Sequence, residues 1–308
     1  MEFYNEKLVL NNVLKSLKGN KDKVVNLLCC VNDVYVDKMI NLMFSIRNFS
    51  DKQINLFVLT TEMNQDSENL IQDKMDYLNV NVKIIHASLP NYDTCNAVWS
   101  LDVYLKVFAF KFLPENIDKI LYLDSDIMAF NDIYDLYCTN VENKLLACVI
   151  DMDVNSQSVF LRRRLLKIKH DYFNSGVMVL NLKLQREKWT FDGINALISS
   201  TQLFFPDQDL LNILCREEDL VFVPYKNNFQ SWWEIRQDSD LEFISPTLIH
   251  FVTMVKPWLP NDFYYTTELF YSCAKLTGLK QFGEVKKLKG LEVSKLQKQI
   301  KKEKANKK

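Results

Sequence analysis

Glycine is scarce in this chain, with six glycines among 308 residues. They form neither the Gly-x-Gly-x-x-Gly loop of dinucleotide-binding domains nor the Gly-x-x-x-x-Gly-Lys-Ser/Thr loop of P-loop proteins. Both of these backbone cradles for a diphosphate are therefore excluded. If the protein binds a diphosphate, a metal ion and side chains must neutralise its charge.

Long apolar runs are also lacking near the N-terminus. The first such run, residues 24–31, is too short to cross a bilayer, and residues 1–23 have no apolar segment of signal-peptide type. The seven cysteines show no Cys-x-x-Cys spacing of a zinc site, and most lie in apolar runs, as buried free thiols do. These observations predict a cytoplasmic protein in a reducing compartment.

A large excess of one charge is absent, because the formal net charge is −1. This balance conceals a basic C-terminus, since residues 284–308 hold ten Lys and three Glu. The rest of the chain is mildly acidic, which disfavours a nucleic-acid-binding core. The hydrophobic content of 48% and the charged content of 25% are typical of a globular protein.

Apolar runs of strand type alternate along the chain with amphipathic segments of helical period. This alternation predicts an α/β fold with a mainly parallel sheet that is flanked by helices on both faces. Ligands of such sheets bind beyond the carboxyl ends of the strands. The predicted strands are residues 24–31, 55–60, 82–86, 120–123, 145–150, 177–182, 221–224 and 248–252, and predicted helices include 37–48, 65–78, 101–113 and 207–217.

The most informative motif is the pair Asp124 and Asp126, which follows the predicted strand 120–123. Two carboxylates two residues apart suit one hard divalent cation, Mg²⁺ or Mn²⁺, that holds a diphosphate. A solvated loop with two acids is the alternative. Haloacid-dehalogenase-type phosphatases also place Asp-x-Asp after a strand, but near the N-terminus and without a residue such as Met128 two positions later.

His250 ends another predicted strand, and Lys256 follows it six residues later. The imidazole could supply a third metal ligand, which would favour Mn²⁺ over Mg²⁺, and the ammonium group could contact a phosphate. The alternative for His250 is a core histidine that bonds a backbone carbonyl. The alternative for Lys256 is a solvated charge.

Two further polar segments border predicted elements. Asn174 and Ser175 stand in a predicted polar turn before the strand 177–182, where they could bond sugar hydroxyls, and Gly176 would permit close backbone approach. Asp207 is predicted to be the N-cap of the helix 207–217. Gln208 follows it, and capping does not explain that side chain.

These segments, taken together and in this order, resemble glycosyltransferase family 8. That family comprises retaining, metal-dependent enzymes that use UDP-sugars, among them glycogenins and bacterial lipopolysaccharide α-galactosyl- and α-glucosyltransferases. The resemblance covers about residues 24–265 and implies a GT-A fold, a Rossmann-like sheet interrupted by the acidic metal motif. The matching segments are residues 31–35, 104–106, 121–126, 173–177, 207–212 and 250–258.

The resemblance also implies roles for individual side chains. Asp124, Asp126 and His250 would ligate Mn²⁺, with Mg²⁺ as the alternative, and Gln208, Asp207 and Asp151 are the candidate catalytic residues, Asp151 on the acceptor side. Asn32 and Tyr35 would contact the uridine, Lys256 the diphosphate, and Asn174 the donor sugar. The full set of candidate donor-binding residues is Asn32, Tyr35, Lys106, Asp124, Ser125, Asp126, Asn174, Ser175, Asp207, Gln208, His250 and Lys256.

Two positions depart from the family pattern. Lys106 stands where the family usually has Arg, and a Lys ammonium lacks the fork geometry of a guanidinium. Thr253 stands where the family often has Gly, and its side chain could crowd the diphosphate. Neither departure removes a predicted metal ligand.

The implied function is a retaining, Mn²⁺-dependent transfer of galactose or glucose from a UDP-sugar to a glycan acceptor, such as a lipopolysaccharide or lipooligosaccharide core. A glycogenin-like self-glucosylating enzyme and a non-catalytic UDP-sugar-binding protein are the alternatives. Self-glucosylation needs an acceptor tyrosine, and none of the thirteen tyrosines is marked as one.

The predicted organisation has three parts: an accessory segment at 1–23, the GT-A domain at 24–280 and a basic tail at 281–308. In the tail, lysines interleave with apolar residues that fall on one side of a helical wheel. This pattern favours a helix at an anionic membrane surface, which would place the enzyme peripherally on the inner face of the membrane. A frayed, solvated terminus is the alternative.

Overall fold

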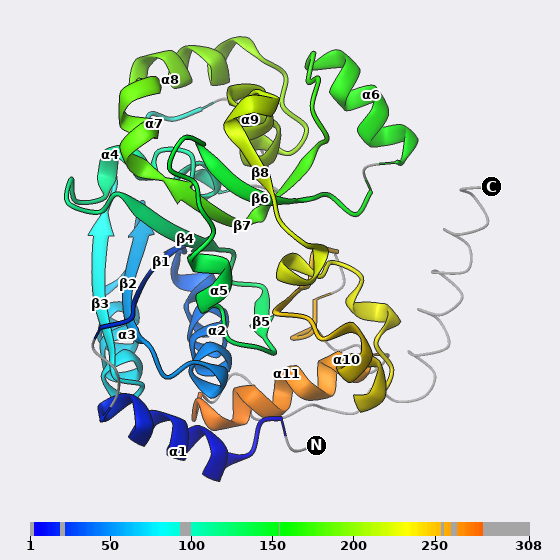
Figure 1. Cartoon of the computed structure of the whole chain (residues 1–308). Helices are drawn as coiled ribbons and strands as arrows, with labels where there is room; N and C mark the ends of the chain where they lie inside the picture. Colours follow the sequence, from blue (N-terminus) through cyan, green and yellow to red (C-terminus); the bar gives the residue numbers. More distant parts are fainter. Residues whose placement is uncertain are drawn as a thin grey trace.

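A computed structural model describes residues 3–18, 22–92, 100–153, 155–253, 256–259 and 264–279. Its centre is a seven-stranded sheet of order β3-β2-β1-β4-β7-β6-β8, in which β7 alone runs antiparallel to its neighbours β4 and β6 (Figure 1). The strands are β1 (Val24–Cys30), β2 (Gln53–Thr60), β3 (Val80–His86), β4 (Lys119–Leu123), β6 (Leu146–Ile150), β7 (Phe173–Asn181) and β8 (Leu220–Phe222). The predicted mixed, mainly parallel sheet is confirmed.

Side chains of each strand alternate between two hydrophobic cores, one on each face of the sheet. In β4, Leu121 and Leu123 join one core, whereas Ile120 and Tyr122 join the other. Because both faces of the strands are covered, the strands read as continuous apolar runs. This explains why the sequence located them well.

Helices cover both faces of the sheet, as Figure 1 shows. Helices α1 (Glu6–Leu17), α2 (Val36–Phe49), α3 (Gln65–Tyr77) and α11 (Tyr265–Leu276) contribute to the core on one face. Helices α4 (Ala109–Phe112), α8 (Phe191–Ser200) and α9 (Pro206–Leu214) contribute to the other. The remaining α-helices of the described residues are α5 (Tyr134–Tyr137), α6 (Gln157–Leu165), α7 (Leu182–Lys188) and α10 (Asp238–Ile244).

A small second sheet pairs β5 (Ile127–Ala129) with β9 (Leu248–His250), antiparallel. Ile127 lies opposite His250 in this ladder. Ser45 of α2 accepts a hydrogen bond from Ala129 N at 2.9 Å, which fixes β5 to the helix layer. The sequence did not predict β5, because a three-residue strand carries almost no periodic signal.

The predicted helix over residues 101–113 is wrong. The segment forms a short 3-10 helix, Leu101–Tyr104, then turns, and only then α4. Its side chains Leu105, Val107 and Phe108 are all buried, so its apolar pattern does not identify one helix face. Asp102 ties the segment to the loops that follow β1 and β2, because its carboxylate accepts bonds from Thr61 N at 2.9 Å and from Asn32 Nδ2 at 3.2 Å.

The sequence predicted a separate segment at each end of the chain. The accessory segment contains α1, whose Val9 and Val13 are buried and whose Asn12 Nδ2 donates to Asn48 O of α2 at 2.5 Å. Whether residues 1–23 form a separate unit stays a prediction. The basic tail, residues 281–308, lies outside the described residues.

A buried guanidinium at the end of α2 stabilises the loops on the β2–β3 side of the sheet. Arg47 donates to the carbonyls of Leu78 at 2.9 Å, Lys52 at 2.9 Å, Ser50 at 3.1 Å and Asn79 at 3.1 Å. Burial lowers the pKa of Arg47 to about 10.

Replacing Arg47→Met should lower the free energy of unfolding by about 3 kcal/mol or more, because several carbonyls lose their donor inside the protein. Urea denaturation measures the change, and Arg236→Met, at an exposed arginine, is the matched control. Equal stability of the two variants would contradict the assignment.

Candidate active site

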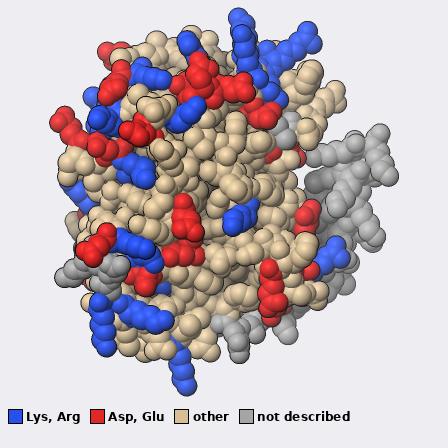
Figure 2. Space-filling model, in the orientation of Figure 1, with Lys and Arg blue, Asp and Glu red and all other residues tan. Residues whose placement is uncertain are grey.

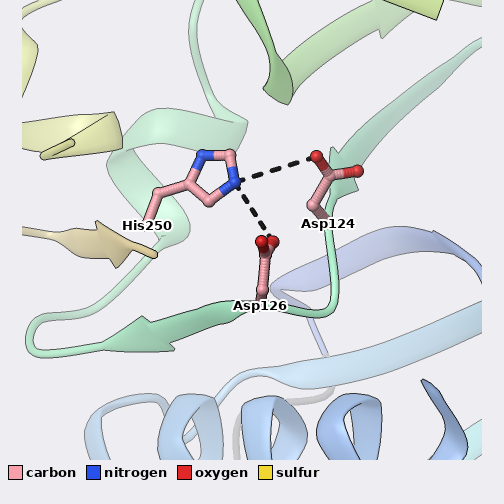
Figure 3. Close-up of side chains that lie close together, drawn as sticks. All are labelled: Asp124, Asp126 and His250. Atoms are coloured by element: carbon pink, nitrogen blue, oxygen red, sulfur yellow. Dashed lines mark ion pairs between the residues drawn. The ribbon is translucent and has the colours of Figure 1, made fainter. Parts of the chain in front are cut away.

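Three potential metal ligands converge at the end of β4. Asp124 directly follows β4, Asp126 directly precedes β5, and His250 ends β9. Figure 3 shows the imidazole pointing at both carboxylates. Its Nε2 lies 3.1 Å from Asp126 Oδ1 and 3.8 Å from Asp124 Oδ2, and one ligand atom from each residue falls within 4.8 Å of the others.

Backbone pairing brings these side chains together. Phe251 N donates to Asp126 O at 3.0 Å, which continues the β5–β9 ladder past His250. Asp124 N donates to Gly176 O at 2.8 Å and so ties the acidic turn to β7. Gly176 is required here, because a Cβ at this position would lie 2.1 Å from His250 Cε1 and 2.8 Å from Asp124 Oδ2.

Asn228 sets the orientation of the imidazole. His250 Nδ1 lies 3.0 Å from Asn228 Oδ1, while Asn228 Nδ2 donates to Asn174 Oδ1 at 2.8 Å. Because Asn228 presents an acceptor oxygen to the ring, His250 Nδ1 carries the proton, and the Nε2 lone pair faces the carboxylates. This is the tautomer that a metal ligand needs, and it favours that interpretation over a core histidine bonded to a carbonyl.

Two ammonium groups compensate the charge of the carboxylates. Lys106, with a side chain only 5% exposed, lies 2.8 Å from both Asp124 Oδ1 and Asp207 Oδ2. Burial opposes its charge, but the two carboxylates outweigh burial and raise the pKa of Lys106. The phenol of Tyr122 also donates to Asp124.

Lys256 is the second of these groups. Its Nζ lies 2.6 Å from Asp126 Oδ2 and donates to Phe251 O at 2.6 Å. Burial would raise the pKa of Asp126, yet the Lys256 ammonium overcomes burial and holds that pKa well below its usual range. Asp126 is therefore ionised and available as a ligand at neutral pH.

A row of hydrogen-bonded side chains continues from this cluster. Gln208 Oε1 accepts from Ser175 N at 3.1 Å and from Asn174 Nδ2 at 3.2 Å. Gln208 Nε2 donates to Asp151 Oδ2 at 3.0 Å, and Ser175 Oγ donates to Asp207 Oδ2 at 2.8 Å. The structure thus brings all three candidate catalytic residues next to the candidate metal ligands.

Two local predictions are wrong. Asn174 and Ser175 do not stand in a turn but inside β7, opposite a register shift after Cys148 in β6. Asp207 is not the N-cap of α9, because Phe205 is the cap residue and Pro206 takes the first helical position. The side chain of Phe205 makes no capping hydrogen bond. Asp209 instead bonds the backbone at the start of the helix, because its Oδ2 accepts from Phe204 N at 2.7 Å and Phe205 N at 2.9 Å. Asp207 is thereby left for Lys106 and Ser175.

The uridine candidates lie in the loop after β1. Asn32 caps a 3-10 helix, Asp33–Tyr35, and donates from Nδ2 to Asp102 Oδ2 at 3.2 Å. Burial and then the charge of Asp126 raise the pKa of Tyr35. Ser125, which stands between Asp124 and Asp126 in the sequence, is buried.

Sequence reasoning missed three residues of the site: Asn228, Tyr122 and Asp102. Each acts through another side chain rather than through a motif of its own. Asn228 orients His250, Tyr122 bonds Asp124, and Asp102 bonds Asn32. No local sequence pattern predicts these roles. Asn228 and Asp102 bond residues that are far away in the sequence, and Tyr122 lies within a buried strand.

The donor set fits a divalent cation. Two carboxylate oxygens and a neutral imidazole nitrogen suit Mn²⁺, whereas Mg²⁺ prefers oxygen ligands. Gly176 keeps the space between His250 and Asp124 free of a side chain.

Comparison with known proteins decides the family. A sequence model of glycosyl transferase family 8 matches residues 26–262, well over half of the chain. The chain belongs to glycosyl transferase family 8.

Several members with assigned names are similar to it. The lipopolysaccharide 1,2-glucosyltransferase of Escherichia coli (strain K12) is 31% identical over 189 residues, covering 57% of this chain and 56% of that protein. The lipopolysaccharide 1,3-galactosyltransferase of Salmonella typhimurium is 25% identical over 187 residues, covering 56% and 53%. This family 8 chain therefore matches a little over half the length of these two relatives.

Solved structures share its fold. The galactosyltransferase LgtC, in complex with donor and acceptor sugar analogs, aligns with a TM-score of 0.69 at 19% identity, covering 82% of this chain and 95% of LgtC. The bifunctional glycosyltransferase WbbM aligns with a TM-score of 0.66 at 19% identity, covering 82% and 50%. The expected GT-A fold is confirmed. Within the described residues, no helix has the length and apolar character to cross a membrane.

The orienting role of Asn228 can be measured directly. Asn228→Ala should weaken Mn²⁺ binding about 10- to 100-fold, because the imidazole loses the partner that fixes its tautomer. Isothermal titration with Mn²⁺ in the presence of UDP gives the affinity. Asn131→Ala, which removes a comparable side-chain bond to Pro246 O at 2.9 Å, is the control. Unchanged affinity in Asn228→Ala would show that the ring needs no such partner.

Burial raises the pKa of Asp151, although bonds from Asp153 N and Gln208 partly offset it. Because the pKa of Asp151 is higher in the folded than in the unfolded protein, the folded protein loses stability as the pH rises through the folded-state pKa of this carboxyl. Asp151→Asn keeps an acceptor oxygen for Gln208 and removes the charge. Urea denaturation should show that the variant gains stability relative to wild type as the pH rises from 4 to 7. Asp73→Asn, at an exposed carboxylate, is the control, and a difference that does not vary with pH would refute the assignment.

Proposed function

We propose that this protein is a retaining, Mn²⁺-dependent hexosyltransferase that moves galactose or glucose from a UDP-sugar to a hydroxyl of a glycan, such as a lipopolysaccharide or lipooligosaccharide core. One observation carries the proposal. The Asp124–Asp126–His250 cluster and the row of Asn174, Gln208 and other polar groups form one continuous site.

The donor would lie across this site. Asn32 and Tyr35 would contact the uridine, and Asp124, Asp126 and His250 would hold the cation. When bound, Mn²⁺ supplies Lewis-acid stabilisation to the leaving diphosphate. Lys256 and Lys106 already lie at the two acidic ligands, at 2.6 and 2.8 Å, so they are placed to neutralise charge on the diphosphate.

The donor sugar would face the amide row. Gln208 is held by Ser175 N, Asn174 and Asp151 together, so its carboxamide is fixed in orientation. An amide is a poor nucleophile, and Asp207 is engaged by Lys106 and Ser175. A positioning role near the anomeric carbon therefore fits Gln208 better than covalent catalysis.

We favour attack by the acceptor hydroxyl from the side of the leaving group, which retains configuration. The bond from the anomeric carbon to the UDP oxygen breaks, and the bond to the acceptor oxygen forms. The acceptor proton passes to the departing phosphate oxygen, so no protein base is needed. Asp151 would orient the acceptor, and its contact with Gln208 at 3.0 Å links the acceptor side to the donor side.

The relatives support the substrate class without fixing the hexose. One is named as a glucosyltransferase and another as a galactosyltransferase, both of lipopolysaccharide. A screen of UDP-glucose and UDP-galactose with oligosaccharide acceptors, analysed by mass spectrometry, would identify the sugar. A UDP-sugar-binding protein without activity would bind the donors and transfer nothing.

Replacing Asp124→Ala should lower Mn²⁺-dependent UDP release at least about 1000-fold, because losing a Lewis acid costs several kcal/mol of transition-state stabilisation. A coupled assay for UDP, run with and without Mn²⁺, measures the rate. Asp132→Ala, which removes a carboxylate 3.2 Å from Lys52 outside the site, should keep the wild-type rate. Activity within a few-fold of wild type in Asp124→Ala would refute the metal assignment.

A further inference from the structure

Helix α6 exposes large apolar side chains that the proposed chemistry does not use. Phe160 is 61% exposed, Leu161 47% and Leu165 66%. The helix stands out from the body at the upper right of Figure 1. Because residues one, four and five positions apart share a broad face of a helix, these three and Arg164 form one face toward solvent. We call these four residues the α6 face.

This face is rigidly mounted. Ser156 caps the helix by accepting from Val159 N at 3.2 Å, and Val159 is buried. On the side opposite Leu161 and Arg164, the Arg162 guanidinium lies over the rings of Phe205, 4.3 Å from its centroid, and Tyr172, at 5.2 Å. The apolar residues are thus exposed on a helix that is held to the body, and fraying does not account for their exposure.

The mounting connects the α6 face to the acceptor end of the candidate active site. Asp151 Oδ1 accepts from Asp153 N at 2.9 Å, and Asp153 O accepts from Ser156 N at 2.7 Å. The same Asp151 bonds Gln208. Phe205, under Arg162, is the cap residue of α9, the helix that carries Asp207 and Gln208. Phe204 and Phe205 are themselves exposed.

The surroundings of the face are basic. Arg163, Arg164, Lys167 and Lys169 follow one another closely on and after α6, and the acid nearby, Asp171, pairs with Arg163 at 3.6 Å. Figure 2 shows Lys and Arg side chains gathered over this region at the upper right. Apolar side chains beside Arg164, Lys167 and Lys169 match a membrane surface, which presents anionic headgroups above its acyl chains.

A second apolar stripe serves as a comparison. On α1, Leu10, Leu14 and Leu17 are exposed at helical spacing, beside Lys7 and Lys15. Helix α1 packs on α2, however, and none of its hydrogen bonds among the described residues reaches the candidate active site. The stripe on α1 therefore provides a control with three exposed leucines beside lysines.

We propose that the α6 face is a membrane contact surface for anionic lipid, which sets the acceptor end of the site against the bilayer. The lipid contact itself stands apart from the enzymatic proposal. Its consequence rests on the proposed function: the acceptor would be a glycan carried on a lipid in that membrane.

The test uses the full-length protein and vesicles of phosphatidylcholine, with or without phosphatidylglycerol. The apolar variant combines Phe160→Ser, Leu161→Ser and Leu165→Ser, and a second variant combines Arg164→Gln and Lys167→Gln. The control combines Leu10→Ser, Leu14→Ser and Leu17→Ser on α1. Co-sedimentation gives the partition coefficient, thermal unfolding checks the fold, and Mn²⁺-dependent UDP release checks the donor site.

We expect wild type to bind the anionic vesicles and the apolar variant to lose about tenfold or more in partition coefficient. The charge variant should bind several-fold more weakly and respond less to added salt. The α1 control should bind like wild type, and UDP release should be the same in all variants. If the apolar variant does not fold, the charge variant decides.

Three results would overturn the membrane proposal: no binding of wild type to anionic vesicles, binding unchanged in the α6 variants, or an equal loss in the α1 control. The last would place the contact on α1, and unchanged binding in all variants would place it on another part of the chain or assign the α6 face to a protein partner. Failure of the enzymatic proposal looks different, because wild type would then release no UDP whatever the vesicles do.

Discussion

The candidate site depends on holding two largely buried carboxylates close together. Asp124 and Asp126 would repel each other unless positive charge compensated them. Lys106 and Lys256 supply that charge, one to each carboxylate, at 2.8 and 2.6 Å. The lysines therefore hold the two ligands in place, and the same ammonium groups are available to a diphosphate that arrives with its cation.

The strand topology explains how the parts of the candidate site are connected. The acidic turn ends β4, bonds β7 through Gly176 and leads into β5, whose pairing with β9 places His250. From His250, a chain of bonds runs through Asn228 and Asn174 to Gln208 and on to the acceptor-side Asp151. The candidate cation site and Asp151 are therefore joined by side chains that hydrogen-bond one another.

The sequence predicted the sheet and most members of the candidate site, because buried strands and a strand-end Asp-x-Asp motif are local signals. It failed where long-range bonds override local preference. Asp207 resembles an N-cap, but Lys106 and Ser175 engage it and Asp209 bonds the helix entry. Asn228 could not be found at all, since its role exists only once β9 and β7 have come together.

The central claim is that one divalent cation is held jointly by the acidic turn and by His250. Diffraction at the manganese absorption edge, from crystals grown with Mn²⁺ and UDP, tests it most directly. The account predicts one anomalous peak between Asp124, Asp126 and His250, with Lys256 bonded to the diphosphate. A map with no peak there, or with the manganese bound to other side chains, would contradict it.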